Sequence, residues 1–210
     1  MNQGPPILYG AGYSVYVRAV RMTLAAKGVE FRHEPVDIFA EGGAPASYLD
    51  IHPFGKIPAF RHGEFVLHET IAITRYIDEG FAGPPLQPEG ADMRARMTQL
   101  MCMADCYRYR PMVWDIYVER SSRSKPDEER IAAAIPKART FLTALEHLTL
   151  GDPWLLGGEP TLADFHLAPM FGYFLQASEG QELIKEFPRL GAWWEHVRSC
   201  DGWQVASTSC

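Results

Sequence analysis

The segment His52–Glu79 reads HPFGKIPAFRHGEFVLHETIAITRYIDE and decides the fold of the first part of the chain. Its apolar, strand-like run contains Pro58, and because proline has no N–H for a strand ladder it belongs at a strand start or an edge. The pair His62-Gly63 predicts a hairpin turn. The apolar spacing after Glu69 is typical of a helix. We therefore expect a β-hairpin followed directly by a helix.

The residues before this segment predict an alternation of strands and helices. The expected elements are a strand at 7–10, a helix at 15–27, a strand at 29–36 and, at 40–53, a loop with at most a short helix. Together with the hairpin and helix, they make an α/β domain over residues 1–82. Residues 83–89 contain three prolines and one glycine, which is typical of a linker.

Residues 90–210 predict an all-α domain. One expected helix contains residues 97–104 and bends near Pro111. Two more start near Pro126 and at Thr161, and the last spans 188–198. Thr161 and Asp164 have the spacing of a capping box, in which two side chains satisfy the first free N–H groups of a helix.

Composition excludes several classes of function. The formal charge is −6, from 20 basic and 26 acidic residues, and no basic run indicates nucleic acid as a partner. No stretch reaches the ~18 apolar residues of a membrane span, and MNQGPPILYG lacks the features of a signal peptide. The four cysteines have no CxxC or zinc-ligand spacing, so we expect no metal site. We expect a soluble, cytoplasmic protein.

Three positions in the first domain are candidate binding residues. Ser14 precedes the first helix, where a hydroxyl and the helix terminus favour an anion such as a thiolate. Glu69 and Thr70 start another helix, where they could hold an ammonium and a carboxylate. A cis bond before Pro58 would leave the main chain of Ile57 free for an extended peptide. Taken alone, each feature is better explained as a helix cap or an edge proline.

In combination, these motifs resemble the glutathione S-transferase family. The matching stretches are LYGAGYSVYVRAVRMTLAAKG, HPFGKIPAF, HETIAITRYI and TLADFHLAP, in this order from about Ile7 to Trp194. The resemblance implies a thioredoxin-like N-terminal domain, an all-helical C-terminal domain, a homodimer, and glutathione as co-substrate. It gives no reason to expect a metal.

The resemblance also implies roles for the candidate residues. Ser14 matches the catalytic serine that faces the glutathione sulfur, and Pro58 matches a cis-proline. Ile57 matches the residue whose main chain pairs with the cysteinyl unit of glutathione. Glu69 and Thr70 match the residues that hold the γ-glutamyl amine and carboxylate.

The chain departs from the family pattern at two places in this domain. Val15 follows the serine where serine-type members often have proline. The loop AEGGAPASY has no basic residue for the glycyl carboxylate of glutathione. Lys56 is the remaining nearby cation and the candidate for that role, although it could equally be a solvated surface lysine.

A second, apolar pocket is the least specified part of the site. Tyr13 flanks Ser14, and Tyr107, Arg110 and Trp114 fall near helical spacing in the second domain. We expect these four residues to line the pocket for the second substrate. For the three helical residues, domain packing or a dimer contact is an equally good interpretation.

The function that follows from the resemblance is conjugation of glutathione to small, mostly apolar electrophiles, as in detoxification. Glutathione-dependent isomerisation or dehalogenation would use the same thiolate. A transferase-like binding module without turnover is the alternative from another class. The sulfur stays in the product only in the first case.

Overall fold

The computed structural model describes residues 4–200 and 202–204, and it divides into two compact units. The first runs to Leu86 and includes residues 202–204, and the second spans Gln87–Cys200. The boundary after Leu86 falls within the linker predicted at 83–89. Each unit has its own core and is described separately.

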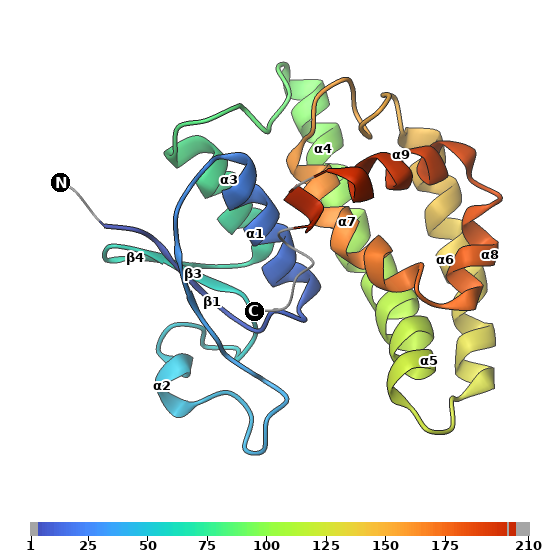
Figure 1. The fold of residues 1–210 in the computed structure, drawn as a ribbon, viewed down its shortest axis with the longest axis horizontal. Helices are drawn as coiled ribbons and strands as arrows, with labels where there is room; N and C mark the ends of the chain where they lie inside the picture. The colour runs from blue at the N-terminus through green and yellow to red at the C-terminus, as the bar shows by residue number, and fades with distance from the viewer. Residues whose placement is uncertain (1–3, 201, 205–210) are drawn as a thin grey trace. The chain divides into compact units, whose positions relative to one another are not determined.

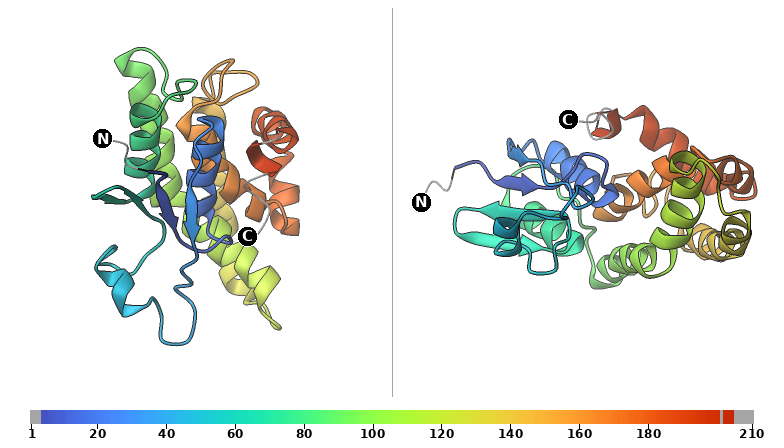
Figure 2. Two further views of the ribbon diagram at one scale, coloured as in Figure 1. Left: turned by 60° about the vertical axis from the view of Figure 1, so that its left-hand side comes forward. Right: turned by 90° about the horizontal axis from the view of Figure 1, so that it is seen from below.

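The first unit is a four-stranded mixed sheet with helices. Its elements are β1 (Ile7–Tyr9), α1 (Val15–Ala26), β2 (Arg32–Glu34), α2 (Ala46–Leu49), β3 (Ala59–His62), β4 (Phe65–His68) and α3 (Thr70–Gly80). The strand order is β2-β1-β3-β4; β1 pairs parallel with β2 and antiparallel with β3, which pairs antiparallel with β4. Helices α1 and α3 lie side by side against the sheet (Figures 1 and 2). This is the thioredoxin-like arrangement that the sequence predicts.

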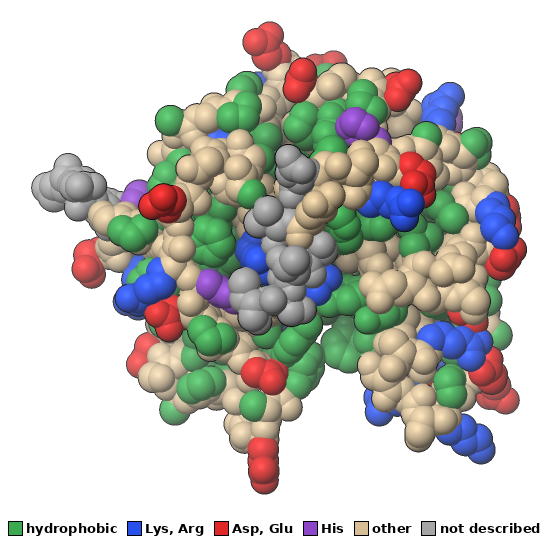
Figure 3. Space-filling view, in the orientation of Figure 1, with side chains coloured by type: hydrophobic (Ala, Val, Ile, Leu, Met, Phe, Trp, Pro, Cys, Tyr) green, Lys and Arg blue, Asp and Glu red, His purple; other side chains and the backbone are tan. Residues whose placement is uncertain are grey.

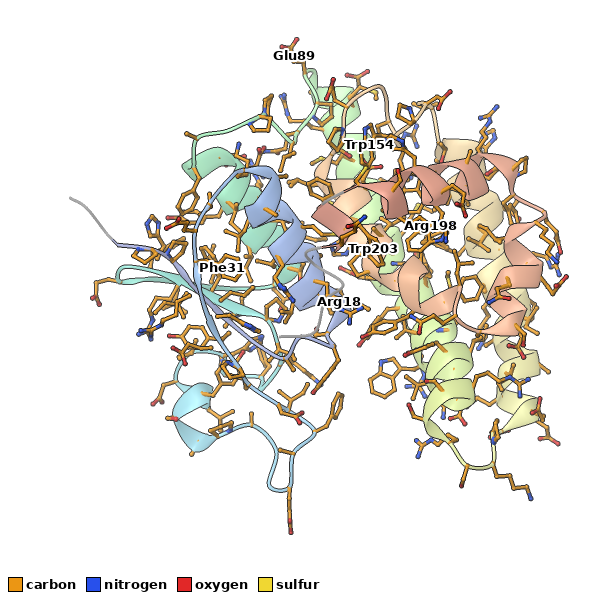
Figure 4. The ribbon with its side chains drawn as sticks, in the orientation of Figure 1. Arg18, Phe31, Glu89, Trp154, Arg198 and Trp203 are labelled. Atoms are coloured by element: carbon orange, nitrogen blue, oxygen red, sulfur yellow. The ribbon has the colours of Figure 1, made fainter. Side chains whose placement is uncertain are left out.

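Helix α1 packs its apolar stripe into the core of this unit. Val17, Val20 and Leu24 follow the helical spacing and are fully buried. Gly28, with φ of 65°, ends the helix in the left-handed conformation that glycine adopts without a steric cost. Arg18, labelled in Figure 4, donates to the carbonyl of Gly12 at 2.9 Å and so ties α1 to the loop after β1.

A buried ion pair joins the C-terminal ends of α1 and α3. The Lys27 Nζ lies 3.0 Å from the Asp78 carboxylate, and both side chains are almost completely buried. Lys27 also donates to the Pro84 carbonyl at 2.9 Å, and Asp78 accepts from the Leu86 N–H at 2.8 Å. The pair therefore holds the start of the linker against the first unit.

The second unit is entirely helical in its regular structure. Its elements are α4 (Ala91–Met103), η1 (Ala104–Val118), α5 (Glu119–Ser122), α6 (Glu128–Leu148), α7 (Leu162–Phe174), α8 (Ser178–Ile184) and α9 (Pro188–Ser199). The predicted all-α domain is confirmed. Helix α8 is an addition, because its seven residues are too short to show a clear apolar period.

The middle of the first long helix is a π-helix. Instead of a simple bend near Pro111, the chain continues from α4 through η1, whose 15 residues include Pro111, into α5. A π-helix bonds residue i to residue i+5, so side chains five apart become neighbours. Tyr109 meets Trp114 edge-on, and Arg110 lies 3.7 Å from Asp115, in agreement with that spacing.

Two nearly buried carboxylates connect η1 and α5 to α6. Arg130 contacts Asp115 at 2.6 Å and Glu119 at 2.8 Å. A shared guanidinium compensates the burial of both charges. Elsewhere the surface is mixed, with acidic and basic side chains interspersed on the face in Figure 3. Among the described residues, no helix combines the length and apolarity needed to cross a membrane.

Candidate functional site

The strand register brings the predicted site residues of the first unit to one end of the sheet. Tyr9 pairs with Ala59, and Ala59 pairs with His68, so these three residues form a row across β1, β3 and β4. The chain leaves this row toward Ser14 on one side and enters α3 at Thr70 on the other. The sheet therefore gathers segments that are far apart in the sequence.

A glycine without room for a side chain brings the segment before β3 close to β1. A Cβ built on Gly10 would lie 2.5 Å from a methyl of Val17 and 3.2 Å from the Cβ of Ile57. Gly10 also has φ of 146°. Ile57 therefore packs directly against Gly10, which follows β1 and lies four residues before Ser14. Any side chain at position 10 would push Ile57 away from the end of β1.

Ser14 is the N-cap of α1 and keeps its hydroxyl proton available. Its Oγ accepts from the Val17 N–H at 3.4 Å, and the residue is half-buried. The hydroxyl donates to no other described residue. A donor at a helix N-terminus is a suitable partner for a thiolate.

Ile57 has the free main chain that the resemblance implies. The Ile57–Pro58 bond is cis, as expected. Both residues are buried, yet neither the N–H nor the C=O of Ile57 bonds to another residue in the described part of the chain. Buried main-chain groups are nearly always paired, so these groups indicate a place where an extended peptide adds its own hydrogen bonds.

Glu69 is the only non-glycine residue among those described with a positive φ, at 71° with ψ of 113°. Such a conformation costs about 1–3 kcal/mol in an L-residue and is found preferentially at functional sites. The side chain is exposed and caps none of the helix N–H groups. The strain thus gives the fold no capping interaction and leaves the carboxylate free for a ligand.

Thr70 begins α3 beside that carboxylate. The residue is 7% exposed, and its hydroxyl makes no hydrogen bond to the described residues. Because no side chain caps the first turn of α3, its N–H groups are also available. A hydroxyl and free amides at a helix N-terminus are a suitable site for a carboxylate.

Two histidines near this site were not singled out by the sequence. The rings of His52 and His68 lie 4.7 Å apart, and His52 is 2% exposed with no partner for its Nδ1. Burial, and then repulsion by His68, hold the pKa of His52 below its usual value, partly offset by Glu69. His52 is therefore neutral in the folded protein near neutral pH.

We expect His52 to make the fold sensitive to mild acid. An imidazole with a lowered folded pKa binds its proton more readily in the unfolded chain, so stability falls as the pH drops below about 6.5. The loss of thermal stability between about pH 7 and pH 5 should therefore be smaller in His52→Asn than in the wild type. His147→Asn, at an exposed position, is the control and should follow the wild type. Parallel curves for all three proteins would contradict this role.

An aromatic pair lies next to Ser14 in the same unit. The ring of Tyr13 stacks on Phe39 at 5.9 Å and 28°, and both are exposed. The Tyr13 hydroxyl donates to Asp37 at 2.5 Å, and this bond lowers the pKa of that carboxyl. Sequence reasoning identified Tyr13 but not Phe39, because a lone aromatic in a glycine-rich loop has no periodic context.

The other residues predicted for the second pocket lie on η1 in the helical unit. Tyr107 is 67% exposed, Arg110 is exposed, and Trp114 is half-buried. The prediction assumed α-helical spacing, whereas η1 is a π-helix. Arg110 is paired with Asp115, and a pocket formed with Tyr13 stays a prediction.

Lys56 is exposed, and its ammonium makes no ion pair with the described residues. Its role toward a carboxylate therefore stays a prediction as well. Across residues 4–200 and 202–204, no cluster of three or more His, Cys, Asp or Glu side chains has the geometry of a metal site.

Comparison with known proteins supports the same interpretation in both units. Residues 5–79 match the model of the glutathione S-transferase N-terminal domain, and residues 128–196 match that of the C-terminal domain. The chain is 29% identical over 198 residues to glutathione S-transferase F13 of Arabidopsis thaliana. This match covers 91% of this chain and 90% of the Arabidopsis protein.

Solved structures give the same family. Glutathione transferase F7 from Populus trichocarpa superposes with a TM-score of 0.84 at 28% identity, over 96% of this chain and 97% of that one. A theta class enzyme from Xanthomonas axonopodis pv. citri with glutathione bound gives a TM-score of 0.80 at 25% identity, over 98% of each chain. The chain belongs to the glutathione S-transferase family.

Proposed function

We propose that this chain binds glutathione at the end of its sheet and transfers the glutathione thiolate to small, mostly apolar electrophiles. The observation that carries the proposal is a set of groups that keep hydrogen-bonding capacity beyond their contacts with the described residues: the Ile57 main chain, the Thr70 hydroxyl and the Ser14 hydroxyl proton. Their separate origins on three segments are typical of a ligand site assembled by the fold.

The thiol needs only modest activation. A free thiol with a pKa of about 8.5 is a few per cent ionised at neutral pH, and lowering it by two units stabilises the thiolate by about 2.7 kcal/mol. One hydrogen bond to an anion contributes about 1.5–3 kcal/mol. A helix N-terminus adds about 0.3–1 kcal/mol. Ser14 and the start of α1 therefore suffice without a general base.

The remaining parts of glutathione have candidate partners in the same unit. Glu69 holds the γ-glutamyl ammonium, and Thr70 with the first amides of α3 holds the adjoining carboxylate. Ile57 pairs with the cysteinyl main chain, next to the cis bond at Pro58. Lys56 takes the glycyl carboxylate, a role supported by its unpaired ammonium and by the loop AEGGAPASY having no base.

The electrophile meets an apolar surface beside the sulfur. Tyr13, stacked on Phe39, supplies an aromatic wall from the first unit. A homodimer acting in the cytoplasm on foreign or toxic electrophiles accords with the family.

The proposal is tested by identifying the product formed from glutathione and 1-chloro-2,4-dinitrobenzene. The thiolate forms a C–S bond at the ring carbon, the C–Cl bond breaks, and chloride leaves with the bonding pair. We expect enzyme-dependent appearance of the S-aryl conjugate by mass spectrometry. Turnover in which glutathione binds but its sulfur is not retained in the product derived from the electrophile would favour the isomerase or dehalogenase alternative. No binding at millimolar glutathione would favour the non-catalytic module.

Two substitutions at Glu69 separate its strain from its function. Glu69→Ala and Glu69→Gly both remove the carboxylate, so both should raise the dissociation constant for glutathione about tenfold or more. Only glycine adopts φ of 71° freely, so Glu69→Gly should be about 1 kcal/mol more stable than Glu69→Ala. Calorimetric binding and urea unfolding of the pair measure both effects. Equal stability would show that the backbone at this position is unstrained.

A further inference from the structure

A single hydroxyl holds the peptide bond that precedes the binding residue Ile57. Tyr48 comes from α2, a one-turn helix in the long connection between β2 and β3, and its OH donates to the Lys56 carbonyl at 2.7 Å. No other hydrogen bond to that carbonyl is present among the described residues. The orientation of this carbonyl therefore depends on one side chain.

The ring that carries this hydroxyl is itself well fixed. Tyr48 is 3% exposed, and its ring lies 6.2 Å from those of Tyr9 and His52. Burial raises the pKa of the Tyr48 phenol, so the hydroxyl keeps its proton at neutral and mildly alkaline pH. Tyr48 is thus a permanent donor at a fixed point, because the packing of its ring sets where the hydroxyl lies.

The geometry of a peptide bond transmits this contact to Ile57. The Lys56–Ile57 bond is trans, since it is not among the two cis bonds of the described chain. In a trans peptide, the C=O and the following N–H point in opposite directions in one rigid plane. Fixing the Lys56 carbonyl toward Tyr48 therefore directs the Ile57 N–H away from it, and that N–H has no partner in the described structure.

We propose that Tyr48 is a positioning residue, which orients the Lys56–Ile57 peptide so that Ile57 can pair with the main chain of glutathione. The inference rests on the proposed function, because it concerns the same subsite. It adds a residue that touches neither the sulfur nor, in this account, any other atom of the substrate. Its effect on binding comes through the peptide plane alone.

Loss of the hydroxyl should weaken binding without slowing the chemical step. With the carbonyl released, the peptide plane samples other orientations, and the apparent dissociation constant rises in inverse proportion to the competent fraction. One hydrogen bond of ordinary strength corresponds to a change of about three- to tenfold. Once glutathione is bound, its own hydrogen bonds hold the peptide, so kcat should stay within about twofold.

The test compares Tyr48→Phe with Tyr76→Phe. Both variants remove one hydroxyl from a tyrosine of the first unit, but the Tyr76 OH contacts His62 Nδ1 at 2.9 Å instead of a main-chain group near Ile57. Calorimetry with S-methylglutathione measures the peptide contacts without thiolate chemistry. Steady-state kinetics with glutathione and 1-chloro-2,4-dinitrobenzene separates KM from kcat, and thermal unfolding checks that each variant is folded.

We expect Tyr48→Phe to weaken S-methylglutathione binding and raise the KM for glutathione about three- to tenfold, with kcat and its pH profile unchanged. Tyr76→Phe should bind as the wild type does. A folded Tyr48→Phe with wild-type affinity would overturn the inference while leaving the proposed function intact. A fall in kcat with unchanged KM would overturn it as well. If the wild type itself fails to bind S-methylglutathione at millimolar concentration, the proposed glutathione site is wrong.

Discussion

Replacing Ser14 with alanine should reduce kcat/KM for conjugation about 10²-fold, with most of the loss in kcat. The hydroxyl stands at the N-cap of α1, and it bonds to a thiolate more strongly than to a thiol. Removing it returns the bound thiol toward its solution pKa, so a smaller fraction is ionised at neutral pH. Steady-state kinetics across a range of pH measures the loss, which should shrink as the pH rises.

Ser47→Ala is the control for this experiment, because Ser47 is an exposed serine on α2. It should behave as the wild type. Tyr13→Phe distinguishes the two hydroxyls near the sulfur, since the Tyr13 hydroxyl is already committed to Asp37. A pH dependence that shifts in Tyr13→Phe and not in Ser14→Ala would assign the activating hydroxyl to the tyrosine.

Replacing Asp164 with alanine should lower the free energy of unfolding by about 3–5 kcal/mol. This carboxylate is fully buried and accepts four hydrogen bonds: from the Leu155 N–H, from the N–H and Oγ1 of Thr161, and from Trp193 Nε1. It caps α7 and connects the loop 149–161, marked by Trp154 in Figure 4, to α9. Alanine leaves four buried donors unpaired. Urea unfolding measures the change.

Asp127→Ala is the matched control for the capping effect. Asp127 caps α6 by accepting from the Arg130 N–H at 3.0 Å, but it is exposed. Its loss should cost about 1 kcal/mol, the usual contribution of a helix cap. Equal losses of stability in Asp127→Ala and Asp164→Ala would mean that burial and the contact with Trp193 add nothing to the stabilisation by Asp164.

Local sequence signals predicted much of the fold. The hairpin, the capping box from Thr161 and the end of the first helix before Gly28 each depend on a few neighbouring residues. Such features are readable because backbone preferences act within one turn. The hairpin turn was predicted one residue too early, because His62 pairs with Phe65 and the turn residues are Gly63-Glu64. The strand at 29–36 was overestimated, since only Arg32–Glu34 pairs with β1. The extent of strand pairing depends on a neighbour that the local sequence does not specify.

The π-helix could not be read in this way. Its apolar residues also fit an α-helical period, and Pro111 indicated only an interruption. Arg130 of α6 contacts Asp115 of η1 and Glu119 of α5, and such tertiary contacts leave no periodic signal in the sequence. For the same reason, the positions of Tyr107 and Trp114 relative to each other follow from the structure and not from their spacing in the sequence.

Sequence patterns identified candidate residues of the first unit, whose binding roles stay predictions, but they did not identify the residues that position them. Ser14, Glu69 and Thr70 stand at helix starts, where sequence patterns are informative. The cis bond before Pro58 followed only from the family resemblance. Tyr48 could not be identified from the sequence, because its partner is a main-chain carbonyl eight residues away. Every residue has such a carbonyl, so the sequence does not show which one accepts a hydrogen bond.

The most direct measurement is a titration of the glutathione complex between about pH 5 and pH 9, followed by the ultraviolet absorbance of the thiolate. If Ser14 stabilises that anion, the thiol pKa in the wild-type complex should lie about one to two units below that of free glutathione. A shift of this size corresponds to one hydrogen bond to a charged group. The Ser14→Ala complex should titrate close to the free thiol. A wild-type complex that ionises with free glutathione would contradict the account.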